Sequence, residues 1–89
     1  MAAMLVRDVL KLIPDNVLVH VIAKRDDGSV FRICFDPCRI VRTDEGELQN
    51  LEVLRVGAMK SREMLHNKEW RTNADVYVIG RLQEDVVTN

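Results

Sequence analysis

Two cysteines and two histidines are the side chains of this sequence with the clearest potential for chemistry: Cys34, Cys38, His20 and His66. A structural zinc site takes four such ligands, so all four would have to converge, and the usual local C-x2-C pair is missing. A histidine among valines is more often a packed, half-buried residue, and a cysteine often behaves as a small hydrophobic one. The sequence therefore predicts no metal site and no cofactor.

Nucleophilic catalysis would have to come from the same four residues, as a pair of one thiol and one imidazole. A reactive cysteine needs an electropositive, partly exposed setting, which a sequence does not reveal. No Ser-His-Asp order, glycine-rich phosphate loop or paired-acid motif accompanies them. We predict a non-enzymatic protein without catalytic residues, and an enzyme acting on nucleotides or thiols is the less favoured alternative.

A basic segment, residues 60–73, is the strongest candidate for binding. We expect it to be a long loop, with a helical turn or two, and long loops in compact domains often carry function. Its cations could hold an anion while its tryptophan offers a stacking face. The predicted ligand-binding residues are Lys60, Arg62, His66, Lys68, Trp70 and Arg71. The alternative is a solvated charged loop whose tryptophan closes the open side of a small core.

Size and composition limit the classes of protein that remain. The 89 residues predict one domain, 1–89, and a hydrophobic content of 47% is enough for a packed core. A net charge of -1 makes nucleic acid an improbable partner. No apolar run approaches the ~20 residues of a membrane span, and the N-terminus lacks the order of a signal peptide. We expect a soluble, cytoplasmic protein that does not bind a membrane.

Hydrophobic periodicity predicts the elements that must position these residues. Apolar residues at three- and four-residue steps from Leu5 to Ile13 predict a helix that ends at Pro14. Alternation predicts strands over 17–24, 30–36, 51–59 and 74–82, whereas 36–50 could form a strand pair or a loop. The predicted fold class is α+β, with the N-terminal helix packed on a mostly antiparallel sheet of four to five short strands.

The turn between the first two strands admits two registers. A two-residue Asp27-Gly28 turn would align the face of Val19 and Val21 with Arg32 and Cys34. A three-residue loop, with Gly28 left-handed, shifts the register by one residue and so turns the second strand over. We favour the second register, because only there do Phe31, Ile33 and Phe35 join Val19, Val21 and Ala23 beneath the helix.

The favoured register leaves the other face of this hairpin open. Exposed apolar patches of that kind usually mark an interface, and symmetric dimers are the commonest result. The predicted interface residues are Leu18, His20, Ile22, Val30 and Cys34, and the predicted partner is a second copy in a homodimer or larger symmetric oligomer. The alternative is that residues 36–50 or the C-terminal strands cover this face.

The first third of the chain carries a family resemblance. Its helix and valine strand resemble those of small proteins from gut Clostridia and their phages and mobile elements, which share a "V-x-D-L-L-x-x-I-x-x-N" pattern. The matching residues are Val6, Asp8, Val9, Leu10, Ile13 and Asn16, with valine replacing the family's leucine at Val9. Residues 60–73 look like an insertion relative to that pattern. The resemblance implies a mobile-element origin and brings no established activity with it.

These observations lead to one functional expectation. We predict a non-enzymatic binding protein of phage or mobile-element type, which antagonises host defence by sequestering a nucleotide signal at an oligomer interface. Its partners would be a second copy and an anionic small molecule. The alternative is an inhibitor that binds a host protein directly, such as an anti-CRISPR protein.

Overall fold

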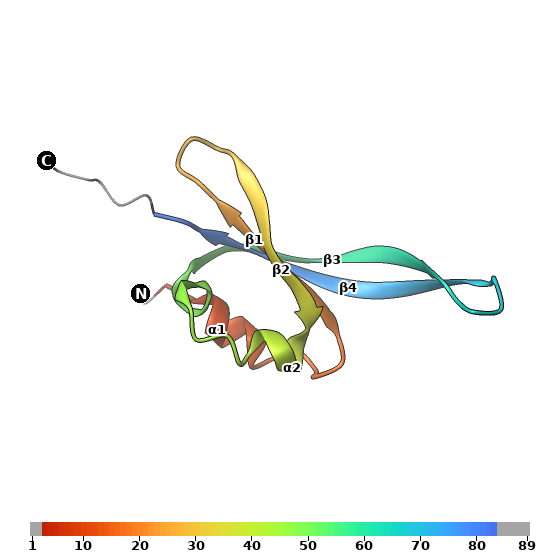
Figure 1. The fold of residues 1–89 in the computed structure, drawn as a ribbon. Coiled ribbons are helices and arrows are strands. Elements are labelled where there is room, and N and C mark those ends of the chain that lie inside the picture. The colour runs from red at the N-terminus through yellow and green to blue at the C-terminus, as the bar shows by residue number, and fades with distance from the viewer. Residues whose placement is uncertain (1–2, 84–89) are drawn as a thin grey trace, which may run out of the picture.

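A mixed four-stranded sheet organises the chain, with a few short helical pieces on one side (Figure 1). The computed structural model describes residues 3–83. The elements in order are α1 (Val6–Leu10), β1 (Leu18–Lys24), β2 (Val30–Pro37), α2 (Cys38–Val41), the 3-10 helix η1 (Glu47–Asn50), β3 (Glu52–Met64) and β4 (Trp70–Arg81). The sheet order is β2-β1-β4-β3: two antiparallel hairpins joined by a parallel pairing of β1 with β4. The predicted α+β class is confirmed.

The core lies between the helical pieces and one face of the sheet. The predicted valine face is fully buried, with Val19 and Val21 both 0% exposed, and it packs with Val6 and Leu10 of α1 and Val78 of β4. A helix as short as α1 is not stable alone in water. Its apolar side is therefore held by this packing, as predicted, although the helix itself covers fewer residues than the periodicity from Leu5 to Ile13 suggested.

An arginine ties the end of α1 to the segment that the sequence left undefined. Residues 36–50 form the end of β2, α2 and η1, with no pair of strands. Arg42, just after α2, donates a hydrogen bond from Nε to the Leu10 carbonyl at 2.8 Å, and its other nitrogens bond the Ile13 carbonyl and Asp15. Free carbonyls at a helix end need such donors, so Arg42 closes the helical layer over the core.

The turn of the β1–β2 hairpin has the predicted three-residue form. Arg25 N donates to Ser29 O at 2.9 Å, and Gly28 has φ +90, a left-handed value that glycine adopts without strain. Asp27 accepts hydrogen bonds from Ser29 N and Oγ, which together lower the pKa of the Asp27 carboxyl. The register next to the turn is also the predicted one, with Ala23 opposite Phe31.

A β-bulge then reverses the rest of β2, and here the prediction was wrong. Past the irregularity beside Val21 and Ile22, Val21 lies opposite Cys34 and His20 lies opposite Phe35. An extra residue in one strand turns the following side chains to the other face. Phe35 is consequently turned away from the valines, and Cys34 packs against the core in its place. Phe31, although it keeps the predicted register opposite Ala23, is not sheltered either: Phe31, Ile33 and Phe35 are each 40% exposed.

The second hairpin is far longer than the sequence suggested. β3 and β4 run to Met64 and Trp70, so residues 60–73 are two strand ends and a tight turn, and the predicted long loop is wrong. Leu65 N donates to Glu69 O at 2.8 Å, and Lys68 adopts φ 64 in the turn. We call residues 60–73 the arm. It projects beyond the helices and the first hairpin, which gives the molecule its 58 Å long axis (Figure 1).

Gly80 allows η1 and α1 to approach the sheet closely. A Cβ placed on Gly80 would lie 2.7 Å from Leu51 Cβ and 3.3 Å from Val6 Cγ2. Gly80→Ala should therefore push the helical layer outward and lower the free energy of unfolding by about 1–3 kcal/mol, as overpacking of a tight core does. Urea denaturation measures the loss, with Gly46→Ala in the exposed 43–47 turn as the surface control, where the added Cβ would meet only the end of the exposed Asp44 side chain. An equal effect of both substitutions would contradict the packing role of Gly80.

Candidate functional site

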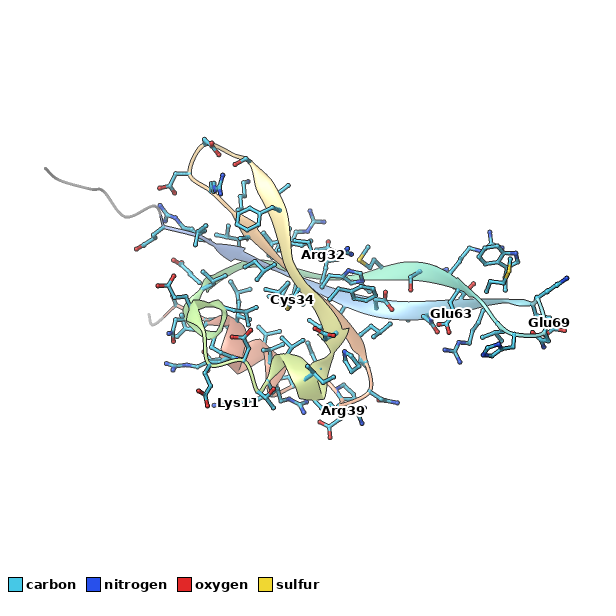
Figure 2. All side chains as sticks on the ribbon, viewed as in Figure 1. Lys11, Arg32, Cys34, Arg39, Glu63 and Glu69 are labelled. Carbon is cyan, nitrogen blue, oxygen red and sulfur yellow. The ribbon has the colours of Figure 1, made fainter. Side chains whose placement is uncertain are left out.

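The arm presents two different faces, because side chains alternate along its strands. What we call the inner face continues the side of the sheet that carries the helices, since Val76 and Val78 of β4 pack in or against the core. Register places five arm residues on the inner face, Lys60, Arg62, Met64, Trp70 and Thr72, and this face continues toward the core through Val56, Ala58 and Ala74. The outer face carries Ser61, Glu63, Arg71 and Asn73. Figure 2 shows side chains extending from both sides of the ribbon, with no other element beside its far end.

The inner face is apolar and basic. Trp70 and Met64 are both 56% exposed and Val56 is 45% exposed, although all three are large hydrophobic side chains. The Arg62 guanidinium lies 4.9 Å from the centroid of the Trp70 ring, a cation–π contact that orders both side chains. Lys60 and Arg62 are the charged residues of this face as the register defines it, so its charge is entirely positive.

The outer face is occupied by its own polar network. Glu63 Oε2 accepts hydrogen bonds from Asn73 Nδ2 at 2.9 Å and from Arg71 at 3.1 Å. These two contacts, the Asn73 bond first, lower the pKa of the Glu63 carboxyl. Arg71 is therefore already paired and points away from Trp70.

The six predicted ligand-binding residues do not form one cluster. Lys60, Arg62 and Trp70 share the inner face, Arg71 lies on the outer face, and His66 and Lys68 lie in the turn. A hollow at the tip is lined by residues 63–67, so it includes only one of the six, His66. Their spacing in the sequence suited a loop that could fold around an anion, whereas a β-ribbon separates neighbouring side chains onto opposite faces.

A buried histidine–aspartate pair is the polar feature that sequence reasoning missed. His20 Nε2 and Asp75 Oδ2 are 2.9 Å apart, and the two residues are 6% and 1% exposed. The Phe35 ring stacks on His20 with centroids 4.1 Å apart. The partners are 55 residues apart in sequence and meet because β1 and β4 pair in parallel, so no local motif could have revealed them.

One oxygen of this pair lacks a hydrogen bond. Asp75 Oδ1 is buried and has no partner among the described residues. A buried acceptor left unpaired costs about 1–3 kcal/mol, and more when it is charged. It lies at the base of the arm, beside a hollow of about 470 Å³ that we call the root hollow, lined by Asn16, Val17, Leu18, Glu63, Arg71, Asn73, Ala74 and Asp75.

The predicted interface residues also separate in the structure. His20 is buried in the pair with Asp75, and Cys34 packs against the core, so neither belongs to an open surface. Leu18 and Ile22 are half-buried, while Val30 is 58% exposed near the turn of the hairpin. The bulge in β2 is the physical reason for this separation. It turns Cys34 toward the core and places Phe35 over His20.

Neither cysteine has the environment of an activated thiol. Both are free, Cys38 is buried and Cys34 is half-buried. Burial raises the pKa of both thiols, and the Cys38 thiol also donates a hydrogen bond to the Leu10 carbonyl at 3.4 Å. Nucleophilic chemistry requires the thiolate, which a raised pKa disfavours at neutral pH.

The raised pKa values predict slow alkylation. At pH 7.5 the folded protein should react with iodoacetamide more slowly than free cysteine, because burial raises the pKa of both thiols and so lowers the fraction present as thiolate. The rate should keep rising with pH beyond the value at which free cysteine levels off. Mass spectrometry of the labelled protein measures this, with unfolded protein in urea as the control. Equal rates for folded and unfolded protein would contradict the assigned burial.

Comparisons with known proteins leave the site to be interpreted from its own geometry. No family model, no curated protein and no solved structure matches the chain. Among residues 3–83, no group of three or more potential ligands could hold a metal ion. Within the same residues, no helix is both long and apolar enough to cross a membrane.

Proposed function

We propose that this is a non-enzymatic binding protein that captures a polypeptide partner on the inner face of its arm. The observation that carries the proposal is the exposure of Trp70 and Met64 at the far end of the arm, where β3 and β4 pair only with each other among residues 3–83. Val56, nearer the core, extends the same exposed apolar face. A two-stranded hairpin has little stability alone in water, and exposed apolar patches usually mark a binding surface.

The charge of the inner face favours one kind of occupant. Lys60 and Arg62 lie between Val56 and Met64 along β3, and the acidic Glu63 lies on the opposite face. A partner surface that combines apolar and acidic side chains would complement this arrangement in both shape and charge. Tryptophan and arginine are also the residue types that most often dominate binding energy at protein interfaces.

Sequestration of a nucleotide, our first expectation from the sequence, is less well supported than direct protein binding. Arg62 already lies over one face of the Trp70 ring, so a base could stack only on the other face. A phosphate would need several free cations, but Arg71 is paired with Glu63 on the other side of the ribbon. We therefore favour the inhibitor alternative. The mobile-element resemblance makes a host-defence protein in the bacterial cytoplasm the first class of partner to test.

The experiment compares variants in capture from bacterial lysate, followed by direct binding to the captured protein. Wild type should retain a polypeptide that Arg62→Glu loses, because charge reversal repels an acidic surface. Val30→Ser is the matched control, since Val30 is equally exposed but lies on β2, away from the arm. Calorimetry with linear and cyclic nucleotides runs in parallel. Heat from a nucleotide that is lost in Trp70→Ser, with no captured protein, would overturn the proposal in favour of nucleotide sequestration.

A further inference from the structure

We propose that two copies of the chain pair through the outer faces of their arms, with Lys68 of each copy entering the root hollow beside Asp75 of the other. The surface used is opposite to the inner face, so the inference goes beyond the proposed function and does not depend on it. It begins from the unpartnered Asp75 Oδ1, which a single chain leaves without a donor.

Among the residues that line the root hollow, one hydrogen-bond acceptor, Asp75 Oδ1, has no donor. Arg71 and the Asn73 amide nitrogen are both used by Glu63 Oε2, which leaves the Asp75 carboxylate as the group in need of a partner. Leu18 and Asn73, which line the hollow, are only half-buried, so the hollow is open to solvent at these two residues. A flexible ammonium group with three donors suits this site.

The second copy supplies that ammonium by symmetry. Along the arm, Lys68 lies in the turn, the Glu63–Arg71 pair lies further in, and Asp75 lies at the root. Arg71 is close to the midpoint in sequence between Lys68 and Asp75. A two-fold axis near this pair would set the arms antiparallel, bring each turn to the other arm's root, and let Arg71 of one copy meet Glu63 of the other.

Charge supports a second copy as the occupant. The arm carries four Lys and Arg residues against two Glu, a net charge of +2, whereas the other described residues, 3–59 and 74–83, carry nine Lys and Arg against ten Asp and Glu, a net charge of -1. Antiparallel pairing brings the Lys68 ammonium of each arm to the Asp75 carboxylate of the other copy, and a charge contact of this kind fixes orientation. The resulting dimer would leave both inner faces open to a partner.

Sedimentation across a concentration series tests the pairing with substitutions at the turn. Lys68 has a positive φ, and asparagine tolerates that geometry, so Lys68→Asn removes the ammonium without strain. We expect the wild type to dimerise, Lys68→Asn to weaken the dimer by roughly tenfold or more, and Lys68→Arg to retain most of it. A wild type that stays monomeric, or a dimer constant unchanged in Lys68→Asn, would overturn the proposal.

Crosslinking tests the geometry. Lys68→Cys protein is mixed with tagged Asn16→Cys protein under mild oxidation, since Asn16 is an exposed residue of the root hollow. A disulfide between the two species is expected. The matched control replaces Asn16→Cys with Asp27→Cys, on the exposed turn of the first hairpin. Equal crosslinking to both positions, or dimers lost in Trp70→Ser but kept in Lys68→Asn, would place the contact elsewhere and refute it.

Discussion

Replacing His20 with leucine should lower the free energy of unfolding by about 3–5 kcal/mol, because it leaves the Asp75 carboxylate buried without its partner. The pair is almost completely shielded from water, so solvent screening cannot replace the lost interaction. The loss is large against a total stability of about 5–15 kcal/mol for a small domain. Urea denaturation followed by circular dichroism measures it.

The double variant His20→Leu/Asp75→Leu separates the pair from its surroundings. Replacing both members of a buried hydrogen-bonded pair with apolar residues is often neutral or stabilising, so the double variant should recover most of the stability. If the double variant is as unstable as the single one, the loss comes from the packing of His20 against Phe35 instead. Phe35→Leu is the control for that stacking contact, and it should cost less than His20→Leu.

The position of His20 and Asp75 in the sheet suggests why the fold contains a buried polar pair. The two hairpins of the sheet are joined by the parallel pairing of β1 with β4, and His20 and Asp75 lie on those two strands. A slip of one residue between the strands would turn one of the two side chains to the other face. We infer that the pair specifies the register at this junction.

Removing the apolar anchors of the inner face should abolish most of the partner binding. The double variant Trp70→Ser/Met64→Ser should weaken the affinity for the captured polypeptide by about 2–4 kcal/mol, or roughly 30-fold to several hundredfold, as loss of a hot spot does. Its stability should change little, because both side chains are more than half exposed. Surface plasmon resonance measures the affinity.

Two further variants serve as controls for the loss of binding in Trp70→Ser/Met64→Ser. Val30→Ser removes a similarly exposed apolar side chain from β2 and should leave the affinity within about threefold, since most surface contacts contribute little. Arg62→Glu should weaken binding more at low salt than at high salt, because the charge on the inner face is screened. An affinity that the Trp70→Ser/Met64→Ser variant leaves unchanged would refute the inner face as the binding surface.

Local chemistry accounts for what could be predicted from the sequence. The apolar spacing up to Pro14, the alternating valines of 17–24 and the Asp-Asp-Gly turn all act through contacts within a few residues of each other. These signals predicted α1, β1, the three-residue loop and the burial of Val19 and Val21, and the structure contains each of them. The α+β class followed from the same patterns.

The tertiary structure decided the features on which the functional proposals rest. The bulge in β2 reflects how β2 packs as a whole, with Cys34 toward the core and Phe35 on His20, which alternation within the strand does not contain. The charged segment 60–73 suits a helix or loop by composition, and it is extended because β3 and β4 continue to pair outward from the core. His20 and Asp75 meet only through the parallel pairing of distant strands. Contacts between residues far apart in the chain depend on the whole fold, so local propensity could determine the elements but not which faces they would leave exposed.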